Sequence, residues 1–271
     1  HKPKHFFQMG VSEFNKIPNE KLPNELFNLD ILDGSPPCSS FSMAGSRQKK
    51  WGVKKKFREG QTEQVLDDLF FEYLDTVKKL LPKVVVAENV KGLIQGSARG
   101  YVKQIFKGFR DAGYTCQLFL LNSAVMGVPQ KRERTFFIAN RLGKKISLSF
   151  NEKLFSIDYD CSSAGAKKLT ELQFEYWKKV TPGKSFSSVH PKGSWFTWFK
   201  ASEHGPQSTL ISGSPRFHFR EPRTFSNIEY KRLQTFPDDY KCKDAHYICG
   251  MSVPPFMMQR ISIEIQKQLL G

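Results

Sequence analysis

The chain has 271 residues, 39% of them hydrophobic and 13% aromatic, a composition that fits a globular protein with a sizeable core and excludes a disordered chain. Forty-two lysines and arginines against 26 acidic residues give a net charge of +16, which favours a polyanionic partner, with a generally basic surface as the alternative. No apolar run reaches membrane-spanning length, and five cysteines without a CxxC pair argue against a disulfide framework or a zinc knuckle and favour a reducing cytoplasm.

Four apolar stretches predict strands that alternate with helices over the first half of the chain. Helical periodicity predicts one helix over 62–81, ended by Pro82, and another over 101–114, ended near Gly113. The strands are predicted at "LFNLDILDG" (26–34), "KVVVAENV" (83–90), "CQLFLLNS" (116–123) and "RTFFIAN" (134–140). Strand–helix alternation of this kind indicates an α/β fold, with a doubly wound, mostly parallel sheet.

The regular helical periodicity of the sequence weakens after about residue 142. Residues 142–220 mix Lys, Ser, Gly and aromatics irregularly, which predicts short strands and loops; Trp195 and Trp198 serve there either as core or as binding residues. Helical spacing returns at "PPFMMQRISIEIQKQLL" (254–270). We expect a catalytic domain over 1–141, a small irregular domain over 142–240 and a C-terminal segment, 241–271, that returns to the first domain.

Three stretches carry side chains suited to chemistry. Cys38 follows two prolines in "GSPPC", where it is either a small packed residue or a nucleophile on a stiff loop. Glu88 follows the apolar run "VVVA", where a carboxylate is costly unless it is bonded. Arg132 and Arg134, two residues apart in "PQKRER", face the same side of a strand, and either bind a carbonyl or phosphate or form a solvated charged run.

The order of the motifs is more informative than any one of them. The motifs are PPCxxFSxAG (36–45), ENVKG (88–92), GVPQxRxR (127–134), RLQTFPDDY (232–240) and GxSVPP (250–255). This series resembles the cytosine-5 DNA methyltransferase family of the bacterial type over residues 34–139 and 223–267. The resemblance implies the S-adenosylmethionine-dependent methyltransferase fold and makes residues 142–240 the target-recognition domain.

The resemblance also implies roles for individual residues. Cys38 corresponds to the nucleophile that attacks carbon 6 of a flipped cytosine, Glu88 holds the base edge and supports protonation of the ring, Arg134 contacts the base carbonyl, and Arg132 supports the same pocket or the backbone. Residues expected to bind S-adenosylmethionine are Pro36, Leu69, Ser252 and Val253. Residues expected to contact DNA are Ser42, Arg47, Lys49 and Lys50, on a loop over about 42–61, and Arg223, as a backbone clamp.

Several features depart from the family pattern on the cofactor side. Met251 stands where the family has an asparagine, Gly10 stands where an aspartate commonly lies near the adenine, and the DxR pattern before "LFFE" is missing. The glycine-rich first motif is not in this chain, so we expect a missing N-terminal part of the fold. Three explanations stay open: the segment is disordered or removed, it lies on a second polypeptide, or the protein is a cofactor-free remnant.

The sequence therefore predicts an enzyme that transfers a methyl group from S-adenosylmethionine to carbon 5 of cytosine in a specific duplex DNA sequence. We expect a cytoplasmic protein encoded by a bacterium or phage, with double-stranded DNA as its partner, no membrane and no metal. A companion restriction endonuclease, or a second chain carrying the missing motif, is a further expected partner. The alternatives are a transfer-RNA cytosine-5 methyltransferase of the same family and a catalytically silent DNA-binding paralogue.

Overall fold

A computed structural model describes residues 3–36, 54–55, 64–65, 69–95, 99–152 and 162–271. The chain divides into two compact units. The first unit consists of His1–Leu121, Glu133–Ser147 and Ile265–Gly271, and the second of Asn122–Arg132 and Leu148–Glu264. Two of the junctions between the units lie close together in sequence, around residues 121–122 and 132–133.

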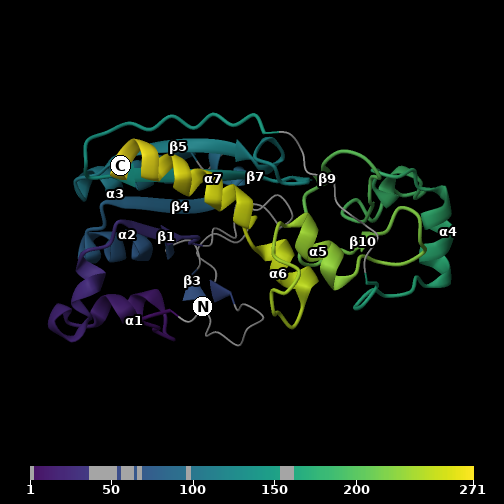
Figure 1. Ribbon diagram of the computed structural model, residues 1–271, viewed down its shortest axis with the longest axis horizontal. Coiled ribbons are helices and arrows are strands. Elements are labelled where there is room, and N and C mark those ends of the chain that lie inside the picture. The colour runs from purple at the N-terminus through teal and green to yellow at the C-terminus, as the bar shows by residue number, and fades with distance from the viewer. Residues whose placement is uncertain (1–2, 37–53, 56–63, 66–68, 96–98, 153–161) are drawn as a thin grey trace. The chain divides into compact units, whose positions relative to one another are not determined.

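The first unit is built on a four-stranded sheet with the order β1-β4-β7-β5 (Figure 1). The strands are β1 (Ile31–Gly34), β4 (Val84–Val90), β5 (Thr115–Asn122) and β7 (Glu133–Asn140). Strand β1 pairs with β4 in parallel, whereas β7 pairs with β4 in the antiparallel direction, so the described sheet is mixed. The predicted α/β class is confirmed, and each of the four predicted strands is present.

Two helices cover one face of this sheet and build the core of the first unit. They are α2 (Leu69–Leu80) and α3 (Arg99–Asp111). The short 3-10 helix η4 (Lys91–Ile94) lies between β4 and α3 in the sequence. The ring of Phe70 in α2 meets the rings of Phe109 in α3 and Phe137 in β7 edge-on, with centroids 6.4 and 5.4 Å apart, respectively. Because side chains alternate along a strand, Val84 and Val86 point to the opposite face, where they are also buried. Burial on both faces accounts for the unbroken apolar run that predicted β4.

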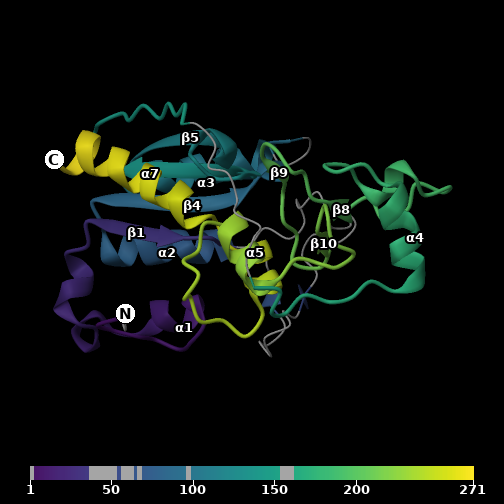
Figure 2. The ribbon, with the colours of Figure 1, turned by 45° about the vertical axis from the view of Figure 1, so that its right-hand side comes forward.

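The segment before β1 packs on the outer side of α2. It contains α1 (Val11–Lys16) and the 3-10 helices η1 (Asn19–Lys21) and η2 (Asn24–Phe27). Figures 1 and 2 both show α1 along α2 on the side away from the sheet. Asn15 donates to the carbonyl of Glu72 at 2.9 Å and accepts from the hydroxyl of Thr76 at 2.8 Å. These bonds join α1 to the middle of α2.

The predicted helix over 62–81 is wrong at its beginning. Helix α2 begins at Leu69, and Gln64–Val65 form a short strand, β3, that pairs antiparallel with β2 (Lys54–Lys55). The helical spacing of Val65 with Leu69 is therefore coincidental, because pairing with a distant segment replaces the helical conformation there. The end of the helix agrees with Pro82, since Leu81 takes a positive φ of 47° and leaves the helical path.

The second unit consists of short elements joined by loops (Figure 1). Its strands are β6 (Gln130–Lys131), β8 (Phe199–Lys200), β9 (Gln207–Ser208) and β10 (Arg216–Phe217), with β6 parallel to β9 and β8 parallel to β10. Its helices are η6 (Ser123–Val125), α4 (Glu171–Lys179), η7 (Phe186–Ser188), α5 (Asn227–Leu233), α6 (Ala245–Met251) and α7 (Pro255–Ile265), which the π-helix η8 (Gln266–Leu270) continues into the first unit. The predicted irregular texture is confirmed for the described part of 142–220, with α4 as an additional helix.

Two apolar clusters hold the second unit together. One lies around Phe225 and Leu233, and the other around Phe186 and Phe217, whose rings lie 4.4 Å apart. Trp195 and Trp198 pack against the second cluster, which supports a core role for this tryptophan pair. Among the described residues, no helix is both long enough and apolar enough to span a bilayer.

Candidate active site

The carboxyl ends of β1 and β4 lie side by side because the two strands are parallel neighbours. Their register places Gly34 opposite Ala87, so the chain leaves β1 just beside the residues that follow Ala87. The phenol of Tyr73, from α2, donates to the carbonyls of Leu32 (3.1 Å) and Val86 (3.2 Å), one on each strand. Burial holds the pKa of Tyr73 well above its ordinary value, so the phenol stays a donor. Ligands of open α/β sheets bind at this kind of strand edge.

Asn89 ties the loop after β1 to the end of β4. Its side-chain amide is buried, donates to the carbonyl of Pro36 at 3.0 Å and accepts from the amide of Val90 at 2.9 Å. Pro36 precedes Cys38 by two residues, and Cys38 itself lies outside the described residues. The bond therefore fixes the last described residue before the predicted nucleophile against the motif that carries Glu88.

Glu88 and Arg134 form an ion pair across the antiparallel ladder of β4 and β7. The Nε of Arg134 lies 2.9 Å from Oε1 of Glu88, and the two side chains are only 17% and 12% exposed. Burial lowers the pKa of Arg134 from its ordinary value, and the charge of Glu88 acts in the opposite direction. A second donor of Arg134, Nη1, reaches the carbonyl of Glu133 at 2.8 Å. The structure thus brings together two of the residues that the sequence predicted for catalysis.

Arg132 has other bonding partners, although it is only two residues from Arg134. Its side chain is 1% exposed and belongs to the second unit, where Nη1 donates to the carbonyl of Leu210 and Nη2 to that of Gly250, each at 3.0 Å. These bonds join the segment around Leu210, which precedes α5, to the end of α6 at Gly250. Arg132 has a structural role within the second unit, and a contact with the base or backbone stays a prediction.

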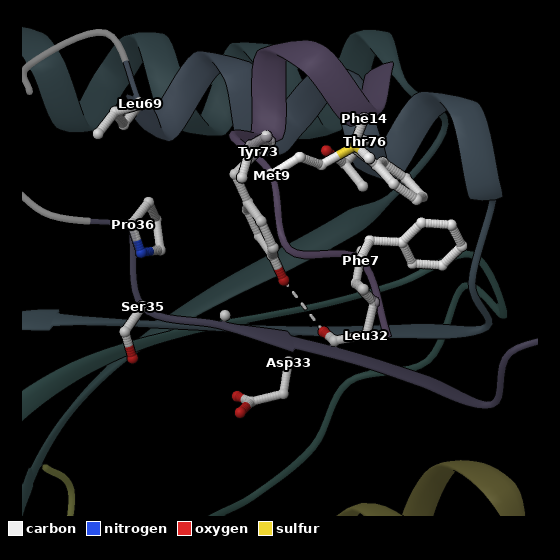
Figure 3. Close-up of a pocket in the computed structure, with 12 residues that line it drawn as sticks. Phe7, Met9, Phe14, Leu32, Asp33, Ser35, Pro36, Leu69, Tyr73 and Thr76 are labelled. Atoms are coloured by element: carbon white, nitrogen blue, oxygen red, sulfur yellow. Dashed lines mark hydrogen bonds between the residues drawn. The ribbon is translucent and has the colours of Figure 1, made fainter. Parts of the chain in front are cut away.

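A pocket of about 370 Å³ opens in the first unit beside the end of β1 (Figure 3). Pro36 and Leu69 lie at one end of it, Phe7 and Phe14 at the other, and the ring of Tyr73 between them. Most of its walls are apolar, and Asp33, Ser35 and Thr76 add polar groups. This mixture fits a ligand with an apolar part and a polar part, as small-molecule pockets commonly do. The pocket contains both cofactor residues that the sequence predicted in the first unit.

The other two predicted cofactor residues, Ser252 and Val253, follow α6 in the second unit. The carbonyl of Ser252 accepts a bond of 2.6 Å from the amide of Gln234, a buried residue at the end of α5. The same amide lies 3.3 Å from the Ser252 hydroxyl. Met251, which departs from the family pattern, is 53% exposed. Cofactor binding by Ser252 and Val253 stays a prediction.

Arg223, predicted to contact DNA, lies in an ion-pair network at the start of α5. Its Nη1 and Nη2 bind both carboxylate oxygens of Glu229, at 2.8 and 2.9 Å, and its Nε binds Glu221 at 2.8 Å. Hydrogen bonds to Glu229 are the main reason why the pKa of Arg223 is raised. Arg223 therefore organises this unit, and its contact with DNA stays a prediction. The other predicted DNA contacts, Ser42, Arg47, Lys49 and Lys50, lie outside the described residues.

The tether by Asn89 and the pocket walls from the N-terminal segment, among them Phe7 and Phe14, were not predicted from the sequence. The motif "ENV" was a signal for Asn89, since a polar residue at the end of an apolar strand needs a partner. Phe7 and Phe14 had no comparable signal, because their place in the pocket depends on how α1 packs on α2.

Comparisons with known proteins identify the family of the chain. The family model described as C-5 cytosine-specific DNA methylase matches residues 4–181 and 161–267. M.NgoFVII, a type II methyltransferase of Neisseria gonorrhoeae, is 30% identical over 83% of this chain and 66% of its own length. M.FnuDI, a type II methyltransferase of Fusobacterium nucleatum, is 32% identical over 98% of this chain and 83% of its own length.

A solved structure supports the fold. A protein proposed to be a DNA modification methyltransferase, encoded within a prophage of E. coli, superimposes with a TM-score of 0.66 at 17% identity, covering 89% of this chain and 80% of that one. The chain spans two thirds or less of the length of three of the curated relatives it matches. The match of the family model over most of the chain shows that the chain belongs to the C-5 cytosine-specific DNA methylase family.

Proposed function

We propose that the protein methylates carbon 5 of cytosine in duplex DNA. The observation that carries the proposal is the pairing of Glu88 with Arg134 beside the strand end from which the chain leads to Cys38. The bond from Asn89 to the carbonyl of Pro36 supports a short distance between this ion pair and the nucleophile loop.

Cys38 acts in this proposal as the nucleophile. Its thiolate adds to carbon 6 of the cytosine ring, and the electrons of the 5,6 double bond make carbon 5 reactive. Negative charge would otherwise build up on the ring as sulfur adds, so an acid beside ring nitrogen 3 lowers the barrier. We assign this role to Glu88, whose carboxylate takes up a proton from solvent before passing it to nitrogen 3. Its carboxyl group lies at the end of β4 and is held by Arg134, which supports the assignment.

Arg134 has two tasks in this proposal. Its Nε holds Glu88 in one orientation, and its position at the start of β7 lets the remaining guanidinium donors bind the base carbonyl. After carbon 5 is methylated, a base from solvent removes the carbon-5 proton. The electrons of that C–H bond reform the 5,6 double bond and expel the thiolate of Cys38, and nitrogen 3 returns its proton to Glu88. The target atom is buried in a duplex, so the base must leave the stack to reach these residues.

The pocket beside β1 is the proposed site of S-adenosylmethionine. The cofactor, when bound, supplies the methyl group that the activated carbon 5 takes up. Pro36 and Leu69 form one wall, and the rings of Phe7 and Phe14 exclude water at the far end. Ser252 and Val253 are also proposed to bind the cofactor. Pro36 lines the pocket and precedes the proposed nucleophile by two residues, so the loop after β1 serves both.

Residues 142–240 are proposed to recognise the target sequence, with Arg223 and the loop bearing Ser42, Arg47, Lys49 and Lys50 at the DNA backbone. The described part of this segment has the short elements and exposed loops on which base contacts are commonly built. Positive charge over the whole chain favours association with DNA phosphates.

A methyl-transfer assay tests the proposal. The full-length protein is incubated with S-adenosylmethionine labelled in its methyl group and either duplex DNA or transfer RNA. We expect 5-methylcytosine in DNA only, and none with Cys38→Ser. Methylation of transfer RNA but not DNA would contradict the substrate class, and DNA binding without any methyl transfer would indicate a silent paralogue.

A further inference from the structure

A tight turn in the second unit carries an exposed phenylalanine at its tip. The amide of Trp198 donates to the carbonyl of Trp195 at 3.0 Å, which closes a four-residue turn with Phe196 in the second position. Phe196 is 66% exposed. Such positions are ordinarily filled by small or polar residues, so a large apolar side chain there is unusual.

The frame around this turn is rigid. The indole rings of Trp195 and Trp198 stack with centroids 5.0 Å apart and planes within 7°, and Tyr176 of α4 meets the Trp195 ring edge-on at 5.0 Å. The hydroxyl of Ser185 donates to the carbonyls of both Trp195 and Phe196, at 3.1 and 2.9 Å. The two tryptophans therefore anchor the base of the turn in the second unit.

The backbone takes an unusual conformation at Trp195, the first residue of the turn. Trp195 has a φ of 61°, a conformation that is unfavourable for a bulky residue and persists only where the surroundings enforce it. On the other side of the tip, the hydroxyl of Ser214 donates to that of Thr197 at 2.7 Å. Single exposed apolar residues are common, but Phe196 differs because a strained, well-bonded frame holds it outward.

The charge of the segment around the turn favours one kind of partner. Residues 176–202 contain five lysines and neither aspartate nor glutamate; Lys178 pairs with the adjacent Glu175, and Lys200 is buried. Lys184 and Lys192 are exposed on the N-terminal side of the turn. An exposed apolar ring in a lysine-rich segment complements a polyanion with apolar faces between its charges, which describes the stacked bases and phosphates of DNA.

We infer that Phe196 is an apolar wedge that inserts against the bases of duplex DNA when the second unit binds its target. The inference rests on the proposed function and adds a residue and a mode of contact to it. The wedge contributes binding energy without base-specific hydrogen bonds, while the exposed lysines of the same segment neutralise phosphates.

The test compares full-length variants in binding and in methylation. The dissociation constant for labelled duplex fragments is measured for the wild type, Phe196→Ser, Phe196→Trp and Leu172→Ser. Leu172 is the matched control, because it is 58% exposed on α4 of the same unit. We expect Phe196→Ser to bind about 5- to 150-fold more weakly, and Phe196→Trp and Leu172→Ser to stay within about threefold of the wild type.

Methylation of the same fragments gives a second readout. Phe196→Ser should raise KM for DNA by a similar factor and leave kcat within about threefold. Wild-type affinity in Phe196→Ser, or an equal loss in Leu172→Ser, would overturn the wedge. A wild type that binds DNA but never methylates it would refute the proposed function, while the binding comparison would still test Phe196.

Discussion

At the residue scale, the ion pair of Glu88 with Arg134 is central to the proposed chemistry. The pair is mostly buried and lies across neighbouring strands, so neither side chain moves freely. Arg134 would bind the base on one side and orient Glu88 on the other. A carboxyl group held in one orientation can stabilise the charge that develops on the cytosine ring as sulfur adds.

The change Glu88→Gln tests this role. Glutamine keeps the shape and can still accept a hydrogen bond from Arg134, but it does not exchange a proton with the base. We expect kcat to fall by about 10²- to 10⁴-fold with the protein still folded, measured by methyl transfer to duplex DNA.

Glu133→Gln is the matched control for this change. Glu133 is an acidic residue at the start of β7 and pairs with Lys91 at 2.8 Å on a more exposed part of the surface. We expect its kcat to stay within about threefold of the wild type. An equal fall in both variants would show that the effect comes from lost charge in the region and not from Glu88.

The change Asn89→Ala tests the tether to the nucleophile loop. It leaves the carbonyl of Pro36 and the amide of Val90 without this side-chain partner in a buried place, which costs about 1–3 kcal/mol of unfolding free energy. We expect slower reaction of Cys38 with cytosine as well, measured as the rate of methyl transfer in a single turnover. Asn122→Ala removes a side-chain bond to the amide of Ala124 and should leave that rate unchanged; an equal rate in wild type and Asn89→Ala would contradict the tether.

At the element scale, the close approach of α2 to β1 shapes the site. A Cβ at Gly34 would lie 2.5 Å from Cε2 of Tyr73, whose phenol is bonded to both β1 and β4. The absence of a side chain at Gly34 therefore permits the phenol to join the two strands.

The change Gly34→Ala should lower the free energy of unfolding by about 1–3 kcal/mol, because the ring of Tyr73 is held and cannot move aside freely. Urea unfolding measures this loss. Gly100→Ala is the control, because a methyl group at Gly100 would meet no atom within 4 Å beyond its own helix α3, and alanine there should stabilise by about 0.5–1 kcal/mol. Wild-type stability in Gly34→Ala would show that the contact is loose.

Elements with strong local patterns could be predicted from the sequence. The run "KVVVAENV" became β4, and "YVKQIFKGFRDAGY" became α3, with a positive φ at Gly113 after its end. The start of α2 could not be predicted, because Gln64–Val65 pair with Lys54–Lys55 and helical spacing says nothing of such pairing. Local periodicity identifies the type of an element better than its limits.

Part of the site could be predicted because its residues stand in recognisable motifs. The motifs identify Glu88 and Arg134, and the pairing of β4 with β7 brings the two residues together. The bond between Asn89 and Pro36 depends on the register of β1 and β4. The surroundings of Arg132 differ from those of Arg134 because the boundary between the two units falls directly after Arg132. None of these distances is contained in the spacing of the motifs.

At the scale of the whole molecule, buried tyrosines in both units should make the protein unstable in alkali. Burial raises the pKa of Tyr114, in the first unit, and of Tyr230, in the second, to about 12 each. The unfolded chain releases these protons near pH 10, so between about pH 10 and 12 the folded state binds more protons and stability falls as pH rises.

Urea unfolding at pH 8 to 11 measures this effect. We expect each tyrosine to contribute a slope of up to about 1.4 kcal/mol per pH unit above pH 10, and none below about pH 9. Tyr114→Phe and Tyr230→Phe should each reduce the slope, whereas Tyr240→Phe, at an exposed ring, should not. An unchanged slope in both buried variants would contradict the prediction.

Covalent trapping tests whether Cys38 is the nucleophile. Full-length protein is mixed with S-adenosylmethionine and duplex DNA in which 5-fluorocytosine replaces cytosine, because fluorine at carbon 5 prevents the final loss of a proton and leaves the thiolate attached. We predict a stable protein–DNA adduct whose modified peptide carries the nucleotide on Cys38, and no adduct with Cys38→Ser. An adduct on another residue, or DNA binding and methylation by Cys38→Ser, would contradict the account.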